Sequence, residues 1–267
     1  MNNRIEYIDV AKALGILLVI YGHCHYTFNI PRLGIAIYSF HMPLFLFISG
    51  MFIKPLDLNT CLRKYSKAYL KPYGVTCILM FLLTLILYLF HQIESSQLSI
   101  LMERIAFGSG SNEDNALFHD IPTVGPIWFL LALFWGCLIS ATIKNITCSS
   151  VNMFLITFVC FVVGYLSAKF IRFPFSFQMG LCSVPFLFTG GLIRQHNLID
   201  RLGESRKYVL ALVFIIWLFV VVTMGNGLNM ASCRYDDGIV RIPLSFFATV
   251  VCLYLCKNKI PPFCKIS

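Results

Sequence analysis

Long apolar runs alternate with short polar segments along the whole chain. Eight runs are apolar over roughly the 20 residues that an α-helix needs to cross the hydrocarbon core of a bilayer. They cover residues 7–27, 33–53, 73–92, 124–143, 151–169, 179–194, 207–224 and 239–256. The connecting segments are polar or rich in glycine and proline, and no internal repeat divides the chain. This pattern predicts an all-α fold, a polytopic transmembrane helical bundle of about eight spans that forms a single domain over residues 1–267.

Composition supports a membrane protein and argues against a soluble one. The chain is 58% hydrophobic and only 12% charged, whereas soluble domains carry about 25% charged residues. The formal net charge of +9 does not point to nucleic acid, because the basic residues stand between the apolar runs. Such residues are typical of the cytosolic loops of membrane proteins. We therefore expect a multi-pass protein of the cell inner (plasma) membrane, with the lipid bilayer as its surroundings and no nucleic-acid partner.

The distribution of lysine and arginine predicts the orientation of the spans. With the N-terminus in the cytosol, most basic residues fall in segments on the inner side: Arg4, Lys54, Arg63, Lys64, Lys67, Lys71, Lys144, Arg194, Arg201, Arg206, Lys207, Lys257, Lys259 and Lys265. The loop 93–121 falls outside and is acidic. This excess of positive charge inside predicts that both termini are cytosolic.

The first run carries polar residues that a lipid-facing helix would tolerate poorly. Asp9, Lys12 and His23 are separated by three and eleven residues, so they share one face of an α-helix. Lys12 and His23 are then about 16 Å apart along the helix axis. Lys12 has a structural alternative, in which it reaches the inner interface and pairs with Asp9. His23 has one too, a hydrogen bond between helices. His25 lies on another face, where an interfacial position is expected.

The second run adds a third histidine and a proline. His41 stands in an otherwise apolar stretch and is followed by Pro43, which frees a backbone carbonyl and bends the helix. Ser49 and Gly50 are small and allow close helix packing. The short connection to the first run makes the two helices antiparallel neighbours. We therefore expect His23 and His41 to line one cavity.

Four segments of the chain resemble a known family of membrane enzymes. They read "DVAKALGILLVIYGH", "FHMPLFLFISGMF", "GPIWFLLALF" and "VPFLFTGGLIR". Together they are similar to the membrane-bound acyltransferase family 3, in its fucose 4-O-acetylase-like branch, and the resemblance runs from Tyr7 to about Leu255. It implies an O-acyltransferase that takes an acetyl group from cytosolic acetyl-CoA and transfers it to a sugar hydroxyl of a cell-surface or exported glycan. Family members usually have about ten spans, so this chain is expected to lack the C-terminal ones.

The resemblance also suggests which residues carry the chemistry. The family's basic residue, followed eleven positions later by histidine, matches Lys12 and His23, and Asp-x-x-Lys matches Asp9 and Lys12. His23 is the expected general base, since imidazole titrates near neutral pH. His41 is a second base, a partner that sets the tautomer, or an oxyanion donor, and the sequence leaves these roles open.

Donor binding requires positive charge at the cytosolic end. Lys12 is expected to bind CoA phosphates as a point charge, with Asp9 orienting its ammonium group. Lys67 and Arg194 are further candidates for binding acetyl-CoA, although ordinary topology-determining charge explains them as well.

Acceptor binding is expected near the outer side. Trp128 is a candidate sugar-stacking platform or an ordinary interfacial tryptophan. The remaining candidates for sugar binding lie in or beside one outer segment, which is otherwise an ordinary polar loop: Asn226, Asn229, Arg234, Tyr235 and Arg241.

Two other classes of function fit some of these features. Broken helices and intramembrane charge also occur in transporters, although no inverted repeat is present. A membrane module that delivers a small molecule or glycan precursor to another enzyme is the second alternative. The eleven cysteines are scattered and include no C-x-x-C pair, so we expect no metal, with acetyl-CoA as the only co-substrate.

Overall fold

The chain is helical throughout the residues that the structure describes. The computed structural model describes residues 5–28, 31–112, 120–202, 207–224, 228–233, 235 and 241–258, and these contain no β-strand. Contacts divide the chain into two compact units. The first unit comprises residues 1–52, 189–229 and 235–267, and the second comprises residues 53–188 and 230–234.

The first unit packs the N-terminal helices against the C-terminal ones. Its helices are α1 (Glu6–Phe28), α2 (Pro31–Tyr38), α3 (His41–Gly50), the end of α9 (Phe177–Gln195), α10 (Leu198–Arg201), α11 (Lys207–Met224) and α12 (Arg241–Asn258). Helix α1 contacts α2, α3 and α12, and α11 contacts α2 and α12. The two ends of the chain sequence therefore share one core, in which Phe47 of α3 meets Phe246 of α12 edge to face at 5.2 Å between ring centroids.

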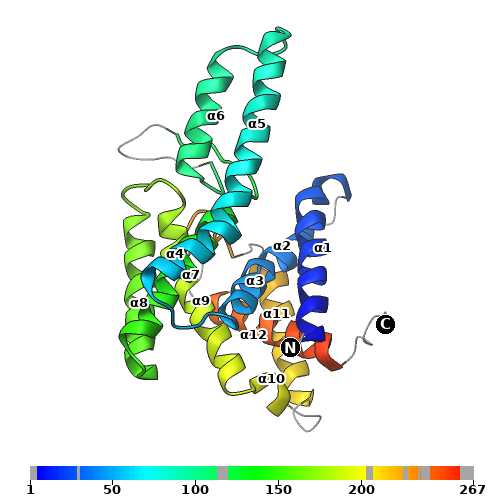
Figure 1. Cartoon of the computed structure of the whole chain (residues 1–267). Helices are drawn as coiled ribbons and strands as arrows, with labels where there is room; N and C mark the ends of the chain where they lie inside the picture. Colours follow the sequence, from blue (N-terminus) through cyan, green and yellow to red (C-terminus); the bar gives the residue numbers. More distant parts are fainter. Residues whose placement is uncertain are drawn as a thin grey trace, which may run out of the picture. The chain divides into compact units, whose positions relative to one another are not determined.

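The second unit is built from the middle of the chain. It contains α4 (Leu58–Tyr65), the π-helical turn η1 (Ser66–Leu70), α5 (Lys71–Leu89), α6 (Ser96–Phe107), α7 (Trp128–Ile146), α8 (Ser150–Ser167) and the first part of α9. Helices α5 and α6 form an antiparallel pair (Figure 1). Asp57 caps α4 by accepting a hydrogen bond from the Thr60 amide at 2.9 Å. This bond holds the pKa of the Asp57 carboxyl below its usual value.

Helices occur at all eight predicted spans. Five segments within the described residues are long and apolar enough to cross a membrane: Glu6–Cys24, Leu33–Gly50, Leu58–Leu89, Trp128–Ile146 and Ser150–Ser167. Helices α9, α11 and α12 coincide with the other three apolar runs, and the total of eight spans stays a prediction. The third helical segment begins earlier than expected, and α6 lies in the loop 93–121, where no helix was predicted.

The second predicted span is interrupted where proline requires it. Helix α2 ends at Tyr38, and α3 begins at His41. Pro43 has no N–H, so the carbonyl four residues earlier, that of Ser39, has no helical donor. Phe40 adopts φ −142° and ψ −16° between the two helices. The expected bend is therefore a real break, and it makes His41 the first residue of a new helix.

Glycines bring the helices of the first unit close together. A Cβ atom at Gly15 would lie 2.8 Å from the Phe45 ring, and one at Gly22 would lie 3.6 Å from the Tyr38 ring. These glycines are seven residues apart, so they lie on one face of α1, and α1 packs through this face on α2 and α3. The predicted polar face of Asp9, Lys12 and His23 is a neighbouring one, on which Lys12 and His23 are exposed.

Candidate active site

His41 is held at the break between α2 and α3 by its own side chain. Its ring is 2% exposed, and Nδ1 lies 2.8 Å from the Ile37 carbonyl oxygen. A carbonyl only accepts hydrogen bonds, so Nδ1 carries the hydrogen and donates it. The donor occupies the position that the His41 amide would take in an unbroken helix. The neutral ring then has its lone pair on Nε2, which leaves this atom able to accept a proton.

Tyr38 lies between the two histidines. Its ring centroid is 6.4 Å from that of His23 and 5.2 Å from that of His41, with edge-to-face geometry in both pairs. The Tyr38 hydroxyl donates a 3.0 Å hydrogen bond to the Gly22 carbonyl of α1. His23 and His41 thus belong to one cluster around Tyr38. His23 is exposed on α1, and the side chain of His25 lies outside the described part of the chain.

Cationic side chains from two helices meet at the other end of α1. Lys12 Nζ is 3.9 Å from the Asp9 carboxylate and 5.7 Å from the centroid of the Phe52 ring. Arg194, near the end of α9, places its Cζ 4.4 Å from the same centroid. The structure therefore brings together two of the three residues that were predicted to bind the donor, and Phe52 lies within reach of both.

A further cation lies near the start of α1. Lys257, in the last turn of α12, forms an ion pair with Asp200 of α10, and its ammonium group is 5.9 Å from the Tyr7 ring. Lys12, Arg194 and Lys257 thus lie at the end of the unit where α1 begins and where α9 and α12 end, with Asp9 beside Lys12 and Asp200 paired with Lys257. Arg194 forms no ion pair with a carboxylate among the described residues, and it is the cation of the three that most favours an anionic ligand.

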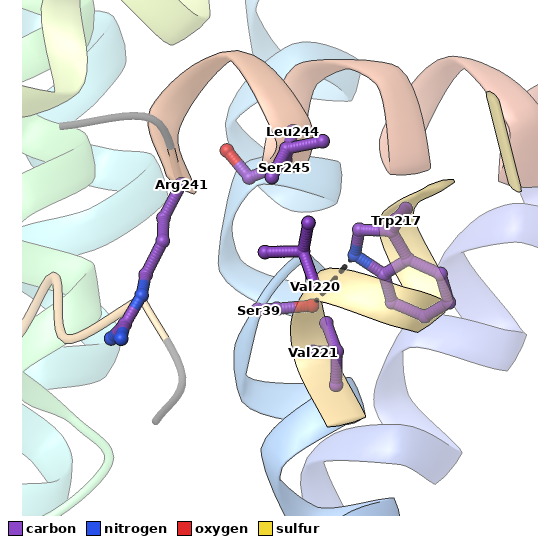
Figure 2. A pocket seen from close by; sticks show the side chains of 7 residues that line it. All are labelled: Ser39, Trp217, Val220, Val221, Arg241, Leu244 and Ser245. Carbon is purple, nitrogen blue, oxygen red and sulfur yellow. Dashed lines mark hydrogen bonds between the residues drawn. The ribbon is translucent and has the colours of Figure 1, made fainter. Parts of the chain in front are cut away.

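A small cavity of about 20 Å³ lies beside the break before His41 (Figure 2). This volume is sufficient for about one water molecule and not for a sugar. Trp217 donates a 3.0 Å hydrogen bond from Nε1 to the Ser39 hydroxyl, which itself donates to the Ala36 carbonyl at 2.7 Å. Arg241 extends from the first turn of α12 on the side of the cavity opposite Trp217 (Figure 2). Arg241 therefore lines the same cavity as Ser39, which precedes His41 by two positions in the sequence.

The other predicted site residues are not part of these clusters. Lys67 is exposed in η1, and Trp128 begins α7 in the second unit. The Trp128 ring is 5% exposed and packs on Phe129 at 5.6 Å, so it has little free surface, and its sugar-stacking role stays a prediction. Asn229 is exposed and Tyr235 is buried in the first unit. Asn226 and Arg234 lie outside the described residues.

Sequence reasoning missed Tyr38, Ser39 and Phe52. Tyr38 stands three residues before His41, and this closeness in sequence was a usable signal, although the break puts the two residues in different helices. Ser39 is the residue whose carbonyl Pro43 frees, which was a second signal. Phe52 had none, because its neighbours Lys12 and Arg194 are remote in sequence and meet it only in the folded unit.

The described residues contain no group of three or more histidine, cysteine or acidic side chains that would hold a metal ion.

Comparisons with known proteins agree with the resemblance at the family level. A family model described as an acyltransferase domain, that of acyltransferase family 3, matches residues 5–266. No curated protein and no solved structure matches the chain. The family match does not distinguish branches, so the fucose 4-O-acetylase-like branch stays a prediction. Because the match covers nearly the whole chain, this membrane protein belongs to acyltransferase family 3.

Proposed function

We propose that this protein transfers an acetyl group from cytosolic acetyl-CoA to a sugar hydroxyl of a cell-surface or exported glycan. One observation carries the proposal beyond the family: α1 runs unbroken from a cationic cluster at Lys12 to the histidine cluster at His23. The two clusters are about 16 Å apart along the helix. This separation suits a donor whose phosphates bind at one end while its thioester reacts at the other.

The histidine cluster supplies the acid–base chemistry of this reaction. His23 takes the proton from the sugar hydroxyl, and the oxygen attacks the thioester carbonyl carbon. The new C–O bond forms, the C–S bond breaks, and the proton passes from the imidazolium to the departing CoA sulfur. Tyr38 holds the His23 region of α1 against α2 through its hydrogen bond to Gly22. His41 is suited to act as a second proton acceptor through Nε2, because its Nδ1–H is bound to Ile37.

The cationic cluster supplies the donor anchor. Lys12 and Arg194 bind the phosphates of acetyl-CoA, with Asp9 orienting Lys12. Lys67 stays a further candidate for binding acetyl-CoA. On the acceptor side, Arg241 is supported by its position at the cavity next to His41. The other proposed sugar-binding residues rest on their expected location near the outer side: Trp128, Asn226, Asn229, Arg234 and Tyr235.

A transporter or a substrate-delivery module is the less favoured alternative. Membership of an acyltransferase family favours an enzyme that transfers an acyl group over a protein that carries a substrate across the membrane. No observation in the described residues favours a carrier specifically.

Purified protein in sealed vesicles tests the proposal. Acetyl-CoA labelled in the acetyl group is added outside, and free CoA thiol and labelled acetate, the product when water takes the acetyl group in place of a sugar hydroxyl, are followed over time. We expect release of CoA thiol by the wild type and loss of this release in the His23→Ala variant. Labelled acetyl-CoA that accumulates inside the vesicles with its thioester intact would instead identify a carrier.

A further inference from the structure

Phe52 is an exposed aromatic residue directly beyond α3. Its side chain is 42% exposed, while its neighbours Met51 and Ile53 are 5% and 7% exposed. The chain thus anchors both flanking side chains and leaves Phe52 partly accessible, with Lys12 and Arg194 over its ring. An isolated exposed phenylalanine needs no explanation, but this ring has cations from two other helices beside it.

Among the described residues, one carboxylate forms an ion pair with the two cations beside Phe52. Arg194 lies 4.4 Å and Lys12 5.7 Å from the ring centroid. Asp9 is 3.9 Å from Lys12, and among the described residues no carboxylate forms an ion pair with Arg194. One aromatic face and an excess of positive charge therefore coincide at this place. A ligand that complements both would carry a flat π-system and negative charge a short distance from it.

We propose that Phe52 is a stacking platform for the adenine ring of the acyl-CoA donor, with Lys12 and Arg194 binding the adjacent phosphates. This inference rests on the proposed function and adds the part of the donor that the catalytic clusters do not explain. Base–aromatic stacking tolerates different ring positions because every base has a π-face. Arginine also stacks on flat rings, so Arg194 is suited to contact either the base or a phosphate.

The platform predicts selectivity between donors. Acetyl-CoA contains the adenine group, whereas acetyl-4′-phosphopantetheine has the same thioester and arm but no nucleoside. In the Phe52→Leu variant, we expect kcat/KM for acetyl-CoA to fall about tenfold, in line with the loss of one stacked base. The value for acetyl-4′-phosphopantetheine should remain unchanged, and Phe52→Trp should retain the preference for acetyl-CoA.

Matched controls separate this role from general damage. Phe90, the residue that follows α5, is 71% exposed, and Phe90→Leu should leave both donors unaffected. The inference is overturned if Phe52→Leu lowers kcat/KM equally for both donors, or if it leaves the value for acetyl-CoA unchanged.

Failure of the proposed function has a different signature, because the wild type would then turn over neither donor. Binding of a CoA derivative with a fluorescent ethenoadenine base still tests the platform in that case. Wild-type binding that is weakened about tenfold in Phe52→Leu supports the platform. Equal binding by both proteins contradicts it.

Discussion

At the scale of single residues, the hydrogen bond of the His41 side chain determines which ring nitrogen carries the hydrogen. Its Nδ1–H donates to the Ile37 carbonyl, so the neutral ring presents a lone pair at Nε2 and no second hydrogen. An oxyanion donor would need a hydrogen on the free nitrogen. In this tautomer the free nitrogen is an acceptor and not a donor, which fits a proton acceptor better than an oxyanion donor, and the role of His41 in catalysis stays a prediction.

Substitution of His41 by asparagine separates the hydrogen bond that Nδ1–H donates to Ile37 from the proposed proton transfer at Nε2. The amide nitrogen of asparagine is able to replace Nδ1–H and donate to Ile37, but the side chain has no basic Nε2. We expect His41→Asn to fold like the wild type and to lose about 10²-fold or more in kcat, the usual effect of removing an acid–base group. Circular dichroism and initial rates on purified protein check both parts. Near-normal activity would show that His41 only holds the helix break.

His23 is the residue whose loss should be most damaging to activity. We expect His23→Ala to lower the transfer rate by about 10²–10⁴, because it removes the general base, while protein abundance in the membrane stays unchanged. His25→Ala is the control on the same helix, since it lies about 200° round from His23, and its effect should be small. Full acetylation by His23→Ala protein would remove His23 from the mechanism.

At the scale of helices, close backbone contact fixes α9 against α3. A Cβ atom at Gly190 would lie only 2.1 Å from the Phe47 carbonyl oxygen and 2.7 Å from the Phe47 Cα. Backbone atoms cannot rotate away as a side chain would, so any larger residue must push the helices apart. This contact positions the end of α9, and with it Arg194.

Gly190→Ala should therefore destabilise the protein. We expect a loss of about 1–3 kcal/mol, typical of overpacking, seen as a lower thermal unfolding midpoint in detergent. Gly74 is the matched control, because it lies in α5 and a Cβ there would meet nothing within 4 Å. Gly74→Ala should leave the midpoint unchanged or raise it slightly, since alanine is the better helix former. Equal effects of the two substitutions would contradict the packing described for α9.

The sequence predicted the positions of helices better than it predicted which residues of remote helices lie close together. Apolar runs of membrane length located α1, α7 and α8 to within a few residues, because burial in lipid requires such runs. Pro43 signalled the break before His41, because a missing N–H is a local property. Helix α6 escaped prediction, since its 12 residues have no long apolar run. The meeting of Lys12 with Arg194 depends on contacts between remote helices, which periodicity does not encode.

At the scale of the whole molecule, the distribution of charge implies a direction across the membrane. Basic residues concentrate in the segments that were assigned to the cytosol, and the loop 93–121 is acidic. The cationic end of the first unit, with Lys12, Arg194 and Lys257, would then face the cytosolic pool of acetyl-CoA. The acceptor would approach from the histidine end.

Reporter fusions test this direction. A reporter at Lys207 should read as cytosolic, and one in the loop 93–121 should read as external, because positive charge is retained inside. Alkaline phosphatase and green fluorescent protein fusions at both positions give complementary readouts. A reversed result at either position would separate Lys12 from the donor pool and undo the two-ended site.

We propose that Lys12 and His23 are the two ends of one site. The most direct measurement is the KM for acetyl-CoA of the wild type, Lys12→Ala and Lys12→Arg, all purified. We expect Lys12→Ala to raise KM more than it lowers kcat, because a phosphate anchor acts equally in the ground and transition states. Lys12→Arg should retain much of the affinity, since arginine also complements phosphate. An unchanged KM in Lys12→Ala, accompanied by lower stability or insertion, would instead make Asp9 and Lys12 a structural ion pair and contradict the account.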